Sequence, residues 1–99
     1  GNKKSSAMNK NALISQVLAI TSHLTGIPVE RITGNHRDAE STDARYIAAT
    51  LLHQHGLYPS QIASCLHRSP RSIRWLLARA TTSMLRSYLA QARTLLSTA

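Results

Sequence analysis

The second half of this sequence contains no acidic side chain. All four carboxylates of the chain lie between positions 30 and 43, at Glu30, Asp38, Glu40 and Asp43. Positions 44–99 instead carry seven arginines, which are Arg45, Arg68, Arg71, Arg74, Arg79, Arg86 and Arg93. A surface of one sign, on a chain with a formal net charge of +8, favours a polyanionic partner, most often a nucleic acid. Arginine strengthens this interpretation because its planar fork fits phosphates and guanine edges. A basic surface that serves solubility alone is the alternative.

Other absences exclude further classes of protein. The sequence has no run of eighteen apolar residues and no signal-peptide pattern, so we expect neither a membrane span nor export. It has no glycine-rich phosphate loop, which excludes nucleotide binding by that route. The single cysteine, Cys65, cannot form an intrachain disulfide, which is typical of the reducing cytoplasm, and we expect it to be a core thiol.

The residues that most often carry chemistry are present in patterns that predict none. Five histidines occur, but His53 and His55 are two positions apart on a predicted helix and point to different faces. The carboxylates near position 40 are expected to pair with Arg37 or Arg45, or to cap a helix that begins at Thr42. We therefore expect no metal site, no cofactor and no enzymatic activity.

Helical periodicity predicts a single all-α domain over residues 9–99, preceded by a disordered polar arm at residues 1–8. Asn9 or Asn11 can cap a first helix that ends near Gly26. A short helical turn follows at residues 27–32, and residues 34–41 are expected to form a loop. The helix capped by Thr42 then has one apolar stripe, made of Ala44, Ile47, Ala48, Leu51 and Leu52. Residues 81–83 either interrupt the helix that precedes them or continue it. The last helix is expected to have one apolar inner face, which consists of Met84, Leu85, Tyr88, Leu89, Ala92, Leu95 and Leu96. The total is five to six helices around one core.

Residues 59–80 predict two helices joined by a tight turn. Ser60 can cap the first helix, and its buried face is Ile62, Ala63 and Leu66. Ser69 followed by Pro70 is a strong start signal for the second helix. The second helix has an inner stripe of Ile73, Leu76, Leu77 and Ala80, and an opposite side of Arg71, Arg74, Trp75, Ala78 and Arg79. An ordinary antiparallel helix pair fits the spacing equally well, but the outward charge favours a DNA-binding helix-turn-helix.

Two further segments resemble a known family. The run Ile27-Pro-Val-Glu-Arg-Ile-Thr-Gly-Asn-His-Arg-Asp, then Asp43-Ala-Arg-Tyr-Ile-Ala, then the helix pair, resembles the C-terminal DNA-binding domain of the bacterial chromosomal replication initiator DnaA. The resemblance covers residues 12–97 and implies the all-α, Trp-repressor-like fold of that domain. It implies that Arg37 matches a loop arginine that enters the minor groove, and that Arg45 matches an arginine near the phosphate backbone.

The resemblance departs from the family at the base-reading signature. The family's Arg-Asp-His-Thr-Thr-Val stands here as Arg68-Ser69-Pro70-Arg71-Ser72-Ile73, after a turn one residue shorter. Arg68 matches the arginine of the family signature, and Ser72 is chemically close to the second threonine of that signature. The aspartate, histidine and first threonine are replaced, so we expect a DNA site other than the initiator's own.

These patterns together predict a module that binds double-stranded DNA, with the second helix of the pair in the major groove. Arg71 and Arg74 would lie near base edges, and Arg45, Arg68 and Arg79 would hold phosphates. The residues expected to contact DNA are Arg37, Arg45, Arg68, Ser69, Arg71, Ser72, Arg74 and Arg79. Replication initiation, its regulation, or a transcription-regulator role stays open.

A protein-interaction or oligomerisation module is the second hypothesis. Its support is Trp75, Tyr88 and the long apolar face of the last helix. For Trp75 there is an equally weighted alternative, in which the last helix folds back and covers it. RNA binding is disfavoured, because no interleaved aromatics offer stacking platforms for unpaired bases.

Overall fold

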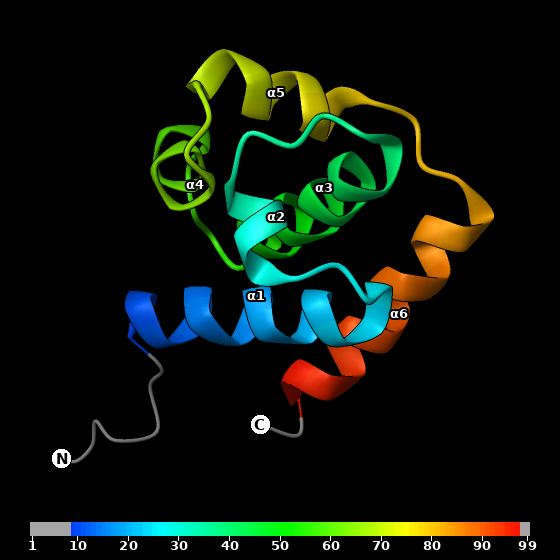
Figure 1. The fold of residues 1–99 in the computed structure, drawn as a ribbon. Helices are drawn as coiled ribbons and strands as arrows, with labels where there is room; N and C mark the ends of the chain where they lie inside the picture. The colour runs from blue at the N-terminus through cyan, green and yellow to red at the C-terminus, as the bar shows by residue number, and fades with distance from the viewer. Residues whose placement is uncertain (1–8, 98–99) are drawn as a thin grey trace, which may run out of the picture.

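The computed structural model describes residues 9–97, which form six helices and no strand. The predicted all-α class is therefore confirmed for this part of the chain, whereas the predicted arm at residues 1–8 lies outside the described residues. None of the described helices is long and apolar enough to cross a membrane. In chain order the helices are α1 (Lys10–Thr25), α2 (Val29–Thr33), α3 (Ala39–Gln54), α4 (Pro59–Leu66), α5 (Pro70–Ala78) and α6 (Ser83–Ser97) (Figure 1).

Helix α3 forms the centre of the fold, since it contacts each of the other five helices. Its predicted stripe is fully enclosed, with no more than 1% exposure at Ala44, Ile47, Ala48, Leu51 and Leu52. Tyr46 and Ala49 are buried as well, because neighbouring helices pack around α3 on more than one side. Any segment attached to α3 is thereby held in place by the main core.

Helices α1 and α6 pack against each other and against α3, and α5 lies across α3 from α1 (Figure 1). Helix α1 buries Val17 completely, and α6 buries Leu85, Leu89 and Ala92. Met84 and Leu95, which the sequence assigned to the inner face of α6, are instead 55% and 38% exposed. The buried stripe of α6 is narrower than predicted because α6 packs mainly on α1 and α3.

Helix α3 begins earlier than the sequence predicted. Its N-cap is Asp38 rather than Thr42, because the Asp38 carboxylate accepts a hydrogen bond from the backbone N–H of Ser41 at 3.0 Å. Thr42 consequently lies within the first turns of the helix. The loop before α3 is therefore short, and its end is fixed by a capping carboxylate.

The caps of α1 and α4 settle two further expectations. Asn9, not Asn11, caps α1 and accepts from the N–H of Ala12 at 2.7 Å. Helix α4 begins at Pro59, so Ser60 lies inside the helix, and the prediction that Ser60 caps it is wrong. The Gln61 side-chain oxygen instead accepts from the N–H of the N-cap residue, Tyr58, at 2.8 Å.

Residues 79–82 interrupt the helix between α5 and α6, which decides the alternative left open by the sequence. The Thr82 hydroxyl accepts from the N–H of Leu85 at 3.2 Å and so caps α6. Ala80 was assigned to the inner stripe of the second helix of the pair, but it is exposed and lies beyond the end of α5. The break lets α6 turn away from α5 toward α1 (Figure 1).

Asp38 makes the stability of this region depend on acid pH. The hydrogen bond from the Ser41 N–H, and then the Arg31 guanidinium at 2.7 Å, lower the pKa of Asp38 from 3.8 to about 2. A carboxyl whose pKa is lower in the folded state stabilises the fold above its unfolded pKa, and this stabilisation is lost as the pH falls through the folded pKa. We therefore expect Asp38→Ala to lower Tm at pH 7, and the gap to the unaltered protein to close between about pH 4 and pH 2.

Thermal melts of both proteins at pH 7, 4 and 2 would check this expectation. Asp38→Asn is the matched control, because asparagine can also cap a helix but, being uncharged, cannot form an ion pair with Arg31. A gap that stays constant from pH 7 to pH 2 would contradict the role given to the carboxylate.

Candidate functional site

Helices α4 and α5 are joined by the three residues His67, Arg68 and Ser69. His67 adopts a left-handed conformation, with φ of 56°, and ends α4. Ser69 caps α5 as predicted, since its hydroxyl accepts from the N–H of Ser72 at 3.1 Å, and Pro70 follows at the first helical position. The start of α5 is therefore defined by local signals that are visible in the sequence.

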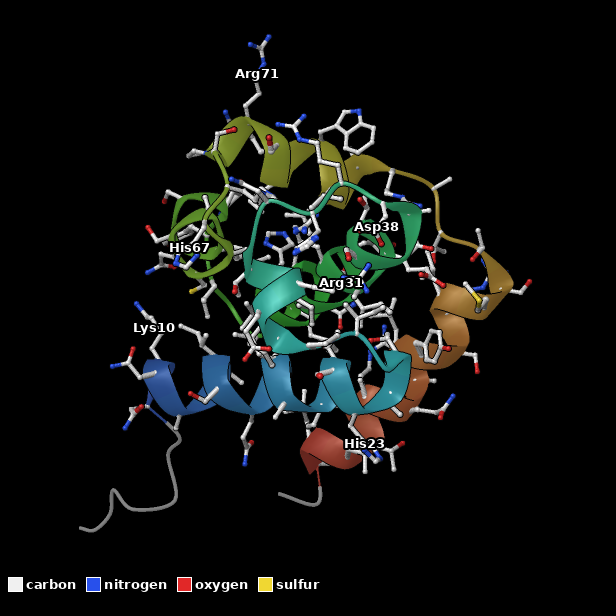
Figure 2. All side chains as sticks on the ribbon, viewed as in Figure 1. Lys10, His23, Arg31, Asp38, His67 and Arg71 are labelled. Atoms are coloured by element: carbon white, nitrogen blue, oxygen red, sulfur yellow. The ribbon has the colours of Figure 1, made fainter. Side chains whose placement is uncertain are left out.

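The face of α5 that points away from the core is basic and aromatic. Ile73 and Leu76 are buried, while Arg71, Ser72, Arg74 and Trp75 are exposed. Figure 2 shows the Arg71 side chain extending from α5 away from the rest of the molecule. Helix α6 does not cover Trp75, which is 66% exposed, so the alternative in which the last helix folds back over this ring is wrong.

Two arginines hold the loop between α2 and α3 by its backbone carbonyl oxygens. Arg45 donates from Nε to Ile32 at 2.8 Å, and from Nη2 to Arg31 at 3.1 Å and His36 at 2.9 Å. Arg68 donates from Nη2 to the Gly34 carbonyl at 2.6 Å and to the His36 carbonyl at 3.3 Å. The two guanidinium groups thus meet at the carbonyl of residue 36, next to Arg37.

The burial of Arg45 corrects its predicted place on the outer surface of the molecule. Its side chain is 3% exposed, and all three hydrogen bonds go to the protein. Burial, and then the positive charge of Arg68, lower the pKa of Arg45 to about 10, so the group is charged at neutral pH. Arg45 therefore positions the loop and does not stand on the outer surface.

Glycine is required at position 34 by close packing. A Cβ at this position would lie 2.6 Å from the carbonyl oxygen of Glu30, a backbone atom that cannot move aside. The His67 ring also reaches this segment, with Nδ1 3.0 Å from the Thr33 carbonyl oxygen. No pattern in the sequence pointed to His67, although position 34 was expected to begin a loop.

Arg79, which the sequence predicted to hold a phosphate, is paired within the chain. Its Nη2 lies 3.2 Å from the Asp43 carboxylate, and its guanidinium lies 5.2 Å from the centre of the Tyr46 ring. Asp38 pairs with Arg31, as Figure 2 shows, and not with Arg37 or Arg45.

Arg37 is left exposed, with no hydrogen bond or ion pair among the described residues. The same is true of Arg71 and Arg74 on α5. Asp38, which follows Arg37 in the chain, and Asp43 of α3 are each paired with another arginine. The charge of these three arginines is therefore not neutralised within the described chain.

A hollow of about 460 Å³ separates the loop from α5. It is bordered by residues of the loop, of α3, of the α4–α5 turn and of α5, and none of them is acidic. They are Arg37, Thr42, Arg45, Arg68, Arg71, Ser72, Trp75 and Leu76. The hollow therefore brings together five of the residues predicted to contact DNA, which are Arg37, Arg45, Arg68, Arg71 and Ser72. Ser69 and Arg74 are neighbours of these residues in the sequence but do not line the hollow. Arg79 does not line it either and is paired with Asp43.

Side chains that bind metals do not gather into a site in the described part of the chain. No group of three histidine, cysteine, aspartate or glutamate side chains there could hold a metal ion. Cys65 is half-buried against the core, and this burial raises the pKa of its thiol. The arginines around the hollow are therefore the feature on which a functional interpretation must rest.

Comparison of the chain with protein-family models, with curated proteins and with solved structures finds no match. The resemblance to the replication initiator's DNA-binding domain accordingly stays a prediction from the quoted residues.

Proposed function

We propose that this protein binds double-stranded DNA, with α4 and α5 acting as a helix-turn-helix. The observation that carries the proposal is a basic hollow whose lining has no acidic side chain. Arg37, Arg68 and Arg71 border the hollow, Arg74 lies on the same outward face of α5, and no carboxylate lines the hollow. Such a surface attracts the phosphate backbone, which supplies much of the affinity in protein–DNA complexes.

The arrangement of elements supports a particular placement on the duplex. The major groove admits an α-helix, and Arg71 and Arg74 occupy the first turns of α5, where helices of this kind contact base edges. The loop with Arg37 lies on the other side of the hollow. In the proposed complex, one DNA strand runs between them, with Arg37 in the adjacent minor groove and Ser69, Ser72 and Arg68 near phosphates.

The biological process is proposed from the resemblance alone. A relation to the replication initiator would place this module in replication initiation or its regulation, and a transcription-regulator role is the alternative. The replaced signature residues favour a DNA site different from that of the initiator family.

A protein-interaction module is the second candidate, and one observation favours it. Trp75 and Met84 are 66% and 55% exposed, which is high for large apolar side chains. Tyr88 is half-buried, so α6 offers a smaller partner surface than the sequence implied. Binding to duplex DNA decides between the two candidates.

The salt dependence of duplex binding tests the proposed function. Arg37, Arg68, Arg71 and Arg74 each bring a positive charge close to the phosphates, whether they bond a base edge or a phosphate oxygen. Binding should therefore release about four counterions, and log K should fall with log salt at a slope of about −3 to −4. Arg37→Ala should reduce the steepness of the slope by about 1. Titration of a labelled duplex by fluorescence anisotropy at several salt concentrations measures both values.

Arg86→Ala is the matched control, because Arg86 is an exposed arginine of α6 that does not line the hollow. It removes the same charge, and we expect it to leave the slope unchanged. Absence of duplex binding at low salt would instead support the interaction module.

A further inference from the structure

The chain has one tryptophan, and its ring stands beside the hollow. Trp75 lines the hollow and is 66% exposed, although tryptophan is usually well covered in folded proteins. Helix α6 packs on α1 and α3 and leaves this ring open. An exposed indole face next to a basic groove is a stacking surface for a planar base.

The inner wall of the same hollow contains a buried guanidinium with unused donors. Arg45 lines the hollow while being only 3% exposed. Its Nε and Nη2 donate to loop carbonyls, but its Nη1 donates to nothing among the described residues. Because arginine has five N–H donors in a fixed plane, the Nη1 group remains available to an acceptor that enters the hollow.

The charges around Arg45 favour an anion at that position. Arg68 lies close enough to lower the pKa of Arg45, so each of these cations raises the free energy of the other. The hydroxyl groups of Thr42 and Ser72 add donors to the lining. A phosphate placed here would relieve the repulsion and form charge-assisted hydrogen bonds, which are the strong ones.

We infer that the hollow binds one nucleoside phosphate whose base is unpaired, with the base stacked on Trp75 and the phosphate held by Arg45 and Arg68. The volume of about 460 Å³ lies within the range of roughly 300–1,000 Å³ typical of small-molecule sites. The ligand is a free nucleotide or an unpaired nucleotide within a DNA strand. The second of these sources of the ligand, an unpaired nucleotide within a DNA strand, rests on the proposed function, since the hollow borders the surface that would contact duplex DNA.

The fluorescence of Trp75 reports directly on a free nucleotide, because the chain has no other tryptophan. The protein is titrated with deoxyadenosine monophosphate, with deoxyadenosine and with inorganic phosphate. We expect saturable quenching by the nucleotide, at concentrations at least about fivefold lower than those needed for deoxyadenosine, because only the nucleotide engages both the ring and the arginines. Absence of saturable quenching by the nucleotide excludes the free-nucleotide source.

A duplex with one unpaired adenine, compared with the fully paired duplex, tests the second source. We expect the bulged duplex to bind about 5- to 30-fold more tightly, in keeping with base–aromatic stacking energies. Trp75→Ala should abolish this preference while keeping affinity for the paired duplex, and Trp75→Phe should retain most of it. Tyr58→Ala is the matched control, since Tyr58 is 70% exposed and lies outside the hollow.

The outcomes separate this inference from the proposed function. Equal binding of the two duplexes, together with no quenching by the nucleotide, overturns the inference and leaves DNA binding intact. If neither duplex binds, the proposed function fails, and the nucleotide titration alone decides the inference. Quenching that persists unchanged in Arg45→Met also overturns the assignment of the phosphate to Arg45, provided that the variant melts cooperatively.

Discussion

Replacing Arg45 by alanine is expected to destabilise the fold by about 3 kcal/mol and to abolish specific DNA binding together. The buried guanidinium satisfies three carbonyl oxygens of the loop, and its removal leaves buried acceptors without partners. For a chain of this size, a loss of that magnitude lowers Tm by more than about 10 °C. Urea denaturation gives the free energy of unfolding, and anisotropy with a labelled duplex gives the affinity.

Arg45→Lys is the informative comparison, because it keeps the charge but has no fork with which to bond several carbonyls at once. If Arg45 acted as a surface phosphate contact, lysine would restore most of the binding and neither variant would lose stability. We expect the opposite, namely that lysine restores little of either property. Binding is to be measured well below the Tm of each variant, so that lost affinity reflects the loop and not global unfolding.

Replacing Arg71 by alanine is expected to cost about 1–3 kcal/mol of discrimination between a selected DNA site and a scrambled one. Arg71 is the second residue of α5, is exposed, and extends away from the core (Figure 2). From that position its fork can reach the two acceptors of a guanine in the major groove. The selected site is obtained by enriching bound duplexes from random DNA, and we expect guanine to be enriched in it.

Arg71→Lys distinguishes base recognition from phosphate contact. A lysine can still hold a phosphate, but it cannot bond a guanine edge through two parallel donors. We expect both variants to lose affinity mainly on the selected site, and Arg86→Ala to lose none. Equal losses on the selected and scrambled sites would show that Arg71 only grips phosphate.

Local signals made much of the fold predictable. Ser69 and Pro70 mark the start of α5 in the sequence, and the apolar stripe of α3 follows helical spacing, so both were found. The start of α3 was misplaced because several polar residues near position 40 can cap a helix, and the hydrogen bond that selects Asp38 is visible only in three dimensions.

The roles of the arginines were harder to predict than the helices. Arg45 bonds to backbone carbonyls 9 to 14 positions away in the sequence, and backbone groups leave no trace in a side-chain pattern. The Arg79–Asp43 pair joins residues 36 positions apart, which only the packing of α5 against α3 brings together. Charge composition therefore predicted a basic surface, but it could not show that Arg45 and Arg79, which were assigned to that surface, are bonded within the chain itself.

The contact between two arginines and the carbonyl oxygen of His36 has a consequence for how this surface could diversify. The loop is held by main-chain atoms, which every amino acid possesses, so its shape does not depend on the side chains at positions 35, 36 and 37. Gly34 is the exception, because a Cβ there would collide with the preceding helix. Chains that differ at those three positions can keep the same scaffold while presenting different chemistry beside α5, which makes the loop a natural place for randomised libraries aimed at new targets.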